Sequence, residues 1–271
     1  MNKLKPLPEE WSDLLNNEQK EAIENINGPL LIIAGAGSGK TRVLTYRYAH
    51  LIKTYGINFE NVLAITFTNK AANEMKDRIS DLLNLELSPK WISTFHSLCV
   101  KMLRIHGHLI GFNNNFTIYD QSDSTKLVRN CMRDSDIDTK QYSPKRIQAH
   151  ISSLKNQRIL PGEAVEFAQS FFDVKVAEIY SSYQKKLMLA NSMDFDDLLI
   201  KAVELLETSD KSLNYWSSKF QYIMIDEYQD TNMVQYRLVE LLASKHKNIC
   251  VVGDSDQSIY ACLLYTSDAA D

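Results

Sequence analysis

A glycine-rich segment between residues 34 and 41 carries the residue types that bind phosphate. It follows the apolar run Leu30–Ile33 and precedes a helical pattern, which is the context that a phosphate-binding loop needs. Glycines let backbone N–H groups close around phosphate oxygens, Lys40 adds a positive charge at the β- and γ-phosphates, and the Thr41 hydroxyl can ligate Mg²⁺. The predicted nucleotide-contacting residues are Ala34, Gly35, Ala36, Gly37, Ser38, Gly39, Lys40 and Thr41. Ala34 stands where the usual pattern has glycine, so the alternative is a glycine-rich strand-to-helix turn without a nucleotide.

Two carboxylates, Asp226 and Glu227, follow the apolar run Tyr222–Ile225. If this run is a strand of the same sheet, Asp226 lies beside the phosphate-binding loop, where it can hold Mg²⁺, usually through water. Glu227 is then placed to polarise the attacking water as a general base. An Asp-Glu pair after a strand is often only the start of a loop, but its occurrence in the same chain as a phosphate-binding loop favours the catalytic interpretation.

Short apolar runs alternate with helical patterns in the segments that must position these residues. Runs at 30–33, 62–66, 222–225 and 249–252 predict strands, and a helix is expected over about 39–54. Thr68 is expected to cap the helix that follows the second strand, and Thr231 the helix between the last two strands. Continuous apolar strands separated by helices predict an α/β fold with a parallel sheet covered on both sides.

The middle of the chain has a different pattern. From about residue 111 to 214 the spacing is helical, as at Ile147 and Ile151 and again at Ala177, Tyr180 and Leu187, and candidates for strands are few. The simplest interpretation is a mostly helical insert at 111–214 in an α/β domain formed by residues 1–110 and 215–261.

Bulk properties are those of a soluble globular protein. Of the 271 residues, 44% are hydrophobic and 24% charged, the net charge is −4, and no apolar run reaches the length of a membrane span. No apolar stretch follows the N-terminal lysines, so a cytoplasmic location without membrane contact is expected. The scattered cysteines are expected to be free thiols, and His106 and His108 point to different sides of a helix.

Six ordered motifs resemble those of the UvrD/PcrA/Rep family of superfamily 1 DNA helicases, and the likeness runs from about Leu15 to Tyr260. They are Leu15-Asn16-Asn17-Glu18-Gln19, the phosphate-binding loop, Thr66-Phe67-Thr68-Asn69-Lys70-Ala71-Ala72, Thr94-Phe95-His96-Ser97, Asp226-Glu227-Tyr228-Gln229-Asp230-Thr231 and Gly253-Asp254-Ser255-Asp256-Gln257-Ser258-Ile259-Tyr260. A further family segment is Met193-Asp194-Phe195-Asp196-Asp197-Leu198-Leu199. The resemblance implies a P-loop RecA-like domain, called 1A in the family, with the helical insert as subdomain 1B.

The resemblance also implies roles. Gln19 would read the adenine edge, Arg42 lies in the nucleotide-contacting stretch, and Gln257 would contact the γ-phosphate and report its loss to the DNA groove. The single-stranded DNA track would be lined by Phe67, Asn69, Thr94, His96 and Tyr260. Stacking on aromatic side chains contributes roughly 1–3 kcal/mol per base. Core packing is the alternative for Phe67 and Tyr260.

The implied activity is that of an ATP-dependent 3′-to-5′ DNA helicase that uses Mg²⁺. Its expected partners are single-stranded DNA, junctions of single- and double-stranded DNA, and repair or replication proteins. Basic residues of the insert could meet the duplex or the strand backbone, although a solvated helix face explains them equally well. They are Lys145, Arg146, Lys155 and Arg158.

The resemblance breaks after Tyr260. Cys262 stands where the family has a base-stacking aromatic and Leu263 where it has an arginine, and residues 262–271 resemble foreign or read-through sequence. The expectation is therefore a chain truncated within motif III, without the second RecA-like domain that supplies arginine fingers. Such a fragment would bind Mg-ATP but neither unwind DNA nor hydrolyse ATP strongly in response to it.

Three other functions compete with this interpretation. The chain could belong to a helicase–nuclease of the AddA or RecB type, which shares these motifs. A phosphate-loop kinase is disfavoured because its chemistry has no use for the Gln257 motif or the Thr-Phe-His-Ser segment. An inert truncated P-loop module is the third alternative.

Overall fold

The computed structural model describes residues 5–35, 37–85 and 89–254, which divide into two compact units. The first comprises residues up to 98, 213–231 and from 239 onward, and the second comprises 99–212 and 232–238. The predicted helical insert, 111–214, thus falls largely in the second unit, which begins earlier and takes in the start of a later helix.

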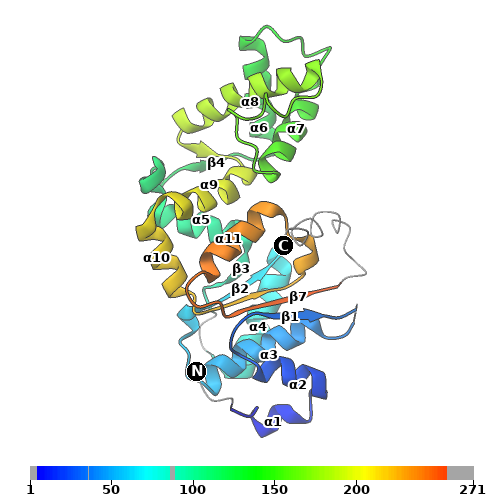
Figure 1. Cartoon of the computed structure of the whole chain (residues 1–271), viewed down its shortest axis with the longest axis vertical. Helices are drawn as coiled ribbons and strands as arrows, with labels where there is room; N and C mark the ends of the chain where they lie inside the picture. The colour runs from blue at the N-terminus through cyan, green and yellow to red at the C-terminus, as the bar shows by residue number, and fades with distance from the viewer. Residues whose placement is uncertain (1–4, 36, 86–88, 255–271) are drawn as a thin grey trace, which may run out of the picture. The chain divides into compact units, whose positions relative to one another are not determined.

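The elements alternate between helix and strand at both ends of the chain and are mostly helical in the middle (Figure 1). In chain order they are α1 (Glu9–Ser12), α2 (Asn17–Glu24), β1 (Leu30–Ile33), α3 (Lys40–Lys53), η1 (Phe59–Asn61), β2 (Val62–Thr66), α4 (Asn69–Leu83), β3 (Ile92–Thr94), α5 (Phe95–His106), η2 (Gly107–Ile110), β4 (Thr117–Ile118), α6 (Gln121–Asp134), α7 (Pro144–Asn156), α8 (Phe171–Leu189), β5 (Ser192–Met193), α9 (Phe195–Thr208), α10 (Asp210–Lys219), β6 (Tyr222–Ile225), η3 (Tyr228–Asp230), α11 (Met233–Ala243) and β7 (Ile249–Gly253).

A five-stranded parallel sheet organises the first unit, in the order β1-β7-β6-β2-β3. Its register pairs Leu30 with Cys250, Ile223 with Ile249, and Val62 with Tyr222. The α/β fold class with a parallel sheet is confirmed. Three of the four predicted strands have the predicted bounds, and the fourth, β7, extends one residue further to Gly253.

Helices α3 and α4 cover one face of this sheet, as Figure 1 shows. Leu44, Tyr48 and Leu51 of α3 pack with alternate strand residues, because successive side chains of a strand point to opposite faces. The expectation of cover on both faces holds for β2 and β6, whose residues are all buried. It is wrong for β1, where Leu31 and Ile33 are 58% and 64% exposed, because they point away from the face on which Leu30 and Ile32 pack, and no described element covers them.

Of the two predicted helix caps, Thr68 and Thr231, the structure confirms only the first. Thr68 caps α4 as predicted, since its hydroxyl accepts a hydrogen bond from the Ala71 N–H at 3.1 Å. The prediction for Thr231 is wrong. Asn232 caps α11 instead, because its side chain accepts from the Gln235 N–H at 2.9 Å while the Gln235 side chain accepts from the Asn232 N–H at 3.1 Å.

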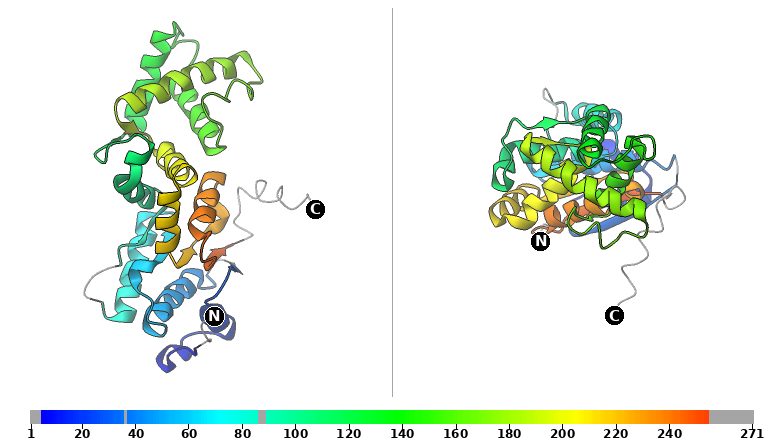
Figure 2. Two further views of the ribbon diagram at one scale, coloured as in Figure 1. Left: turned by 60° about the vertical axis from the view of Figure 1, so that its left-hand side comes forward. Right: turned by 90° about the horizontal axis from the view of Figure 1, so that it is seen from above.

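The second unit is built around α6, α7 and α8, which pack on one another (Figure 2). The predicted helical periodicity is confirmed, because Ile147, Ile151, Ala177, Tyr180 and Leu187 are all buried in the shared core. The only strands of this unit among the described residues are β4 and β5, which form a short parallel pair.

The structure corrects the interpretation of one basic residue in this unit. Lys155 is 1% exposed, and its ammonium group lies 2.7 Å from both Asp194 and Asp197, so it cannot face DNA. Two carboxylates compensate the burial of its charge, and they come from a segment about forty residues further along the chain. Arg158 pairs with Glu207 at 2.9 Å.

The remaining two basic residues of that predicted set, Lys145 and Arg146, are exposed. Cys99, Cys131 and Cys250 are buried thiols, and Cys262 lies outside the described residues. Among the described residues, no helix is long and apolar enough to cross a membrane.

Candidate nucleotide-binding site

The predicted site residues follow the carboxyl ends of the parallel strands. The glycine-rich loop follows β1, and Asp226 and Glu227 follow β6, while Asp254, which was not predicted as a site residue, follows β7. Parallel strands end at one edge of a sheet, so these segments line a single edge in the order of the strands, which is where open α/β sheets bind ligands. The edge continues to β2 and β3, which lead to Phe67 and to the segment from Thr94 to His96 (Figure 1).

The glycine-rich loop leads directly into the N-terminus of α3. Gly39 has the N-cap position with φ of 87°, and Gly37 has φ of 76°, so both occupy the left-handed region that glycine adopts without strain. The space at Gly39 is also restricted, since an added Cβ would lie 3.0 Å from Nε2 of Gln19. Free N–H groups at a helix N-terminus attract anions, so the loop can hold phosphate.

Lys40 is buried at the first position of α3 and points back into the loop. Its ammonium group donates to the carbonyl oxygens of Ala34 and Gly35 at 2.9 and 3.2 Å. It also pairs with the Asp254 carboxylate at 3.3 Å. The positive charge is thus held at the centre of the loop by groups that a phosphate could replace.

Gln19 is brought to the same loop by α2. Its side-chain oxygen accepts from the Asn16 N–H at 3.2 Å, which completes a capping box at the start of the helix. Its amide nitrogen donates to the Ser38 carbonyl at 3.0 Å. The residue predicted to read adenine therefore contacts the phosphate-binding loop directly.

Two oxygen ligands suited to Mg²⁺ meet at the start of α3. The Thr41 hydroxyl donates to the Asp226 carboxylate at 2.9 Å, although the two residues are 185 positions apart. Burial raises the pKa of Asp226, and the neighbouring Glu227 charge also raises it, whereas the Thr41 hydrogen bond opposes the change.

The residues present fit Mg²⁺ held together with a nucleotide. Mg²⁺ prefers oxygen ligands and is usually held by one or two carboxylates plus substrate phosphates. Within the described ranges, no group of three or more histidine, cysteine, aspartate or glutamate side chains could hold a metal ion. Thr41 and Asp226 supply the protein side of a site that phosphate oxygens would complete.

Glu227 is held in an unusual backbone conformation. Its φ is 53°, in the left-handed region that is sparsely populated by residues other than glycine, and its N–H donates to the Asp226 carboxylate at 3.1 Å. Non-glycine residues in this region cluster at functional sites. The turn places Glu227 beside Asp226 and half-buried at the sheet edge.

Two residues of this edge were absent from the predicted site. Asp254 is 2% exposed and pairs with Lys40, and Gln229 is 7% exposed and links Glu227 to β7. Both lie within motifs quoted from the sequence, directly after an apolar strand or two residues after Glu227. Their place in these motifs could have indicated them, but the contacts that bring both to the site, from Asp254 to Lys40 and from the Asp254 N–H to Gln229, join segments more than twenty residues apart.

Arg42 lies one residue beyond Thr41 and is exposed, with its guanidinium 5.6 Å from the centre of the Tyr46 ring. Arg42, Tyr46 and Arg78 help to line an open cleft of about 370 Å³ between α3 and α4. The cleft offers an aromatic and cationic wall next to the phosphate-binding loop.

Four of the predicted DNA contacts lie at the β2 and β3 end of the edge. Phe67 is half-buried, and its ring packs edge to face on Phe95 at 5.8 Å, so it combines packing with exposure. Asn69 is exposed, His96 is half-buried, and Thr94 is buried with its hydroxyl donating to Ser97 at 3.0 Å. Ala36, Gln257 and Tyr260, also predicted site residues, lie outside the described residues.

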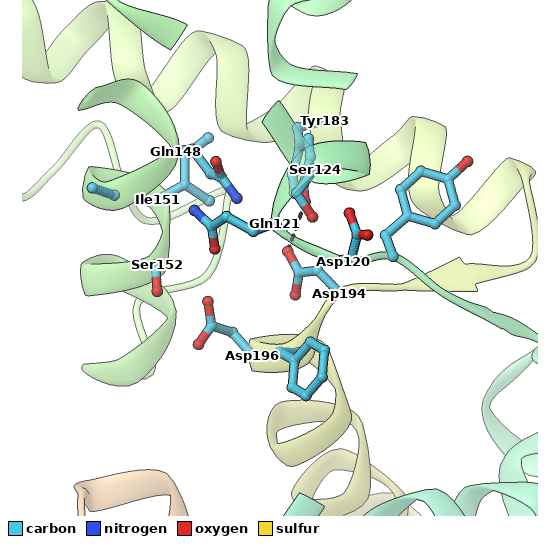
Figure 3. A pocket seen from close by; sticks show the side chains of 12 residues that line it. Asp120, Gln121, Ser124, Gln148, Ile151, Ser152, Tyr183, Asp194 and Asp196 are labelled. Carbon is cyan, nitrogen blue, oxygen red and sulfur yellow. Dashed lines mark hydrogen bonds between the residues drawn. The ribbon is translucent and has the colours of Figure 1, made fainter. Parts of the chain in front are cut away.

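A separate polar cavity of about 280 Å³ lies in the second unit, within reach of α6, α7 and α9. Figure 3 shows Asp194 and Asp196 at its wall, with the Tyr183 hydroxyl donating to Asp194 at 2.8 Å. Burial raises the pKa of Asp196, and hydrogen bonds from Ser152 and Asn156 oppose this. The cavity belongs to the polar network around Lys155 and is not shared with the sheet edge.

Comparison with known proteins identifies relatives over almost the whole chain. The family model of the UvrD/REP helicase N-terminal domain matches residues 15–263. The ATP-dependent DNA helicase PcrA of Staphylococcus aureus (strain Mu50 / ATCC 700699) is 50% identical over 246 residues, which make up 91% of this chain and 34% of that protein. The PcrA helicase of Staphylococcus epidermidis (strain ATCC 35984) is 49% identical over the same shares. The chain thus spans about a third of the length of these curated relatives.

Proposed function

The chain belongs to the UvrD/REP helicase N-terminal domain family, and from this premise we propose that it is the Mg-ATP-binding part of an ATP-dependent DNA helicase. The observation that carries the proposal is the contact between Thr41 and Asp226 at 2.9 Å, beside the buried Lys40. It joins the two halves of a phosphate and Mg²⁺ site from opposite ends of the chain. A helicase needs such a site because ATP hydrolysis drives its movement.

The roles of the residues follow from their chemistry. Lys40 and the loop N–H groups bind the β- and γ-phosphates, and Thr41 with Asp226 holds Mg²⁺, which neutralises charge that develops on the phosphates. Glu227 accepts a proton from the attacking water as general base. Gln257 contacts the γ-phosphate, and Gln19 recognises the adenine edge.

The DNA part of the proposal uses the far end of the same sheet edge. Phe67, Asn69, Thr94, His96 and Tyr260 contact single-stranded DNA, on which the parent protein moves in the 3′-to-5′ direction and opens duplex at junctions. The exposed part of Phe67 can stack on a base of any sequence. The first unit corresponds to domain 1A of the family, and the second to subdomain 1B.

The isolated 271-residue chain is proposed to bind Mg-ATP without unwinding DNA. It spans 34% of the length of the PcrA relatives, and residues supplied by a second RecA-like domain complete the ATP site in this family. An arginine finger of that kind contributes roughly 10³–10⁵ in rate.

Binding of a fluorescent ATP analogue in the presence of Mg²⁺ tests the proposal. The unmodified chain is expected to bind, and Lys40→Ala is expected to weaken binding at least tenfold, about 1.4 kcal/mol, because the charge at the phosphates is lost. Lys70→Ala is the matched control, since its side chain is exposed on α4. Equal affinity of Lys40→Ala and the unmodified chain would contradict the proposed site.

A further inference from the structure

We propose that Gln229 is a positioning residue that orients the Glu227 carboxylate for catalysis and ties it to β7. The inference rests on the proposed function, because it concerns the general base of ATP hydrolysis. It adds a residue that acts through Glu227 without touching the nucleotide.

The Gln229 side chain connects two elements of the sheet edge. Its Nε2 donates to Oε2 of Glu227 at 2.7 Å, and its Oε1 accepts from the Asp254 N–H at 3.0 Å. The partners require opposite ends of the amide, since a carboxylate only accepts and an N–H only donates. The amide therefore has one orientation that satisfies both, and a rotated amide would lose both hydrogen bonds.

Close packing fixes the amide in this place. Gln229 is 7% exposed, and its Oε1 lies 3.0 Å from where a Cβ of residue 253 would be. Because residue 253 is glycine, the Gln229 oxygen can come close to the backbone of β7. A buried amide with both ends satisfied resists reorientation, because movement would leave polar groups without partners.

The Glu227 carboxylate depends on this amide for its direction. Gln229 provides the one hydrogen bond to that carboxylate among the described residues. A glutamate side chain has three rotatable bonds, so a half-buried carboxylate without a donor would sample several directions. A general base must lie within hydrogen-bond reach of the water that it deprotonates, and small misplacement costs rate.

The same connection relates the general base to the phosphate-binding lysine. Asp254 offers its backbone N–H to Gln229 and its carboxylate to Lys40 at 3.3 Å. Residue 254, which follows β7, therefore contacts Lys40 directly and Glu227 through the Gln229 amide. The Gln229 side chain provides the two hydrogen bonds that connect residue 254 to Glu227, the proposed general base.

Two substitutions separate the roles of the amide. Gln229→Met keeps the length of the side chain and removes both hydrogen bonds. Gln229→Glu keeps an oxygen that can accept from Asp254 but places a second carboxylate against Glu227. Gln235→Met is the matched control, because Gln235 is also a 7% exposed glutamine that caps a helix and does not contact Glu227.

The measurement combines ATP affinity with the single-turnover rate of hydrolysis of radiolabelled ATP by the full 271-residue chain. Gln229→Met and Gln229→Glu are expected to lower the rate roughly ten- to a hundredfold, within the ~10²–10⁴ that general-base catalysis contributes. Affinity should change less than about twofold in Gln229→Met, because this variant removes no phosphate or Mg²⁺ ligand and adds no charge. In the Glu227→Gln background, Gln229→Met should lower the rate no further, since its effect passes through Glu227.

The outcomes are distinct. An unchanged rate in Gln229→Glu, or an equal loss from Gln229→Met with and without Glu227, would overturn the positioning role. Failure of the unmodified chain to bind ATP, or an unchanged rate in Glu227→Gln, would overturn the proposed function instead. If Gln229→Met does not fold by circular dichroism, the isosteric Gln229→Glu variant alone decides.

Discussion

At the scale of single residues, the candidate site combines buried charge with restricted backbone geometry. Lys40 is 9% exposed and is held by two carbonyl oxygens and one carboxylate. Gly39, directly before it, has positive φ and lies against Gln19. Both features prepare the loop for a phosphate, and each can be altered separately.

Replacement of Gly39 by alanine should destabilise the chain by about 1–2 kcal/mol, the cost of left-handed backbone for an L-residue. The new Cβ would also press on the Gln19 amide at 3.0 Å. Urea unfolding of the unmodified chain and the variant measures the difference. Gly35→Ala is the matched control, because Gly35 has no positive φ and no atom within 4 Å of an added Cβ. Equal losses in the two variants would contradict the argument.

Replacement of Asp254 by asparagine should tighten ATP binding, roughly three- to tenfold, or up to about 1.4 kcal/mol. The Asp254 carboxylate pairs with the Lys40 ammonium group at 3.3 Å and adds a negative charge next to the expected phosphates. Asparagine removes the charge and keeps the size. Titration with a fluorescent ATP analogue measures the change, with Asp230→Asn as a control for loss of a nearby charge. Weaker binding by Asp254→Asn would show that the carboxylate assists the nucleotide.

At the scale of elements, strands were predictable where local sequence decides the structure. In the run Val62–Thr66 every residue before the final threonine is apolar because both faces of β2 are buried, and the bounds agree with the structure. The loop between β1 and α3 was predictable because its glycine positions and the following helix are also local features. Prediction of the Asp226 position needed only the rule that parallel strands end at one edge.

The remaining features depend on contacts between distant segments. Lys155 has the sequence context of a solvated helix face, and only Asp194 and Asp197 explain its burial. The second partner of Gln229, besides Glu227, is a backbone group of residue 254, which no spacing rule indicates. Exposure of Leu31 and Ile33 reflects the lack of a described element over that face of β1, which the strand pattern does not encode.

Removal of the Lys155 charge tests the buried ion network of the second unit. Lys155→Met should destabilise the chain by about 3–5 kcal/mol, because two buried carboxylates lose their counter-ion. Burial already raises the pKa of Asp197 to about 6. Thermal or urea unfolding measures the loss.

A triple variant provides the control for this prediction. Adding Asp194→Asn and Asp197→Asn to Lys155→Met removes the uncompensated charges and should recover a large part of the stability. Asparagine can still cap α9 in place of Asp194. No recovery in the triple variant would indicate that packing of the lysine side chain, and not charge, determines the cost.

At the scale of the whole molecule, the order of the strands would distribute the two proposed functions, nucleotide binding and DNA binding, along one edge of a sheet. The nucleotide residues follow β1, β7 and β6, and the described candidates for DNA contact follow β2 and β3. Because β6 and β2 are direct neighbours, the general-base loop and Phe67 follow adjacent strands. Under the proposed function, changes at the nucleotide would reach the DNA track through adjacent strand ends.

This proximity does not by itself produce DNA-stimulated hydrolysis. The chain spans about a third of the length of its PcrA relatives, and under the proposed function an arginine finger from a second RecA-like domain lowers the barrier by about 4–7 kcal/mol, from the ~10³–10⁵ effect on rate. We expect the isolated chain to hydrolyse ATP slowly and to show less than about a twofold increase with single-stranded oligonucleotide. Steady-state phosphate release with and without oligonucleotide measures this, and fluorescence anisotropy of the labelled oligonucleotide establishes whether DNA is bound. Strong stimulation would mean that the described sheet edge is sufficient to couple DNA binding to catalysis. DNA binding without stimulation would mean that the coupling needs residues outside this sheet that close over the triphosphate.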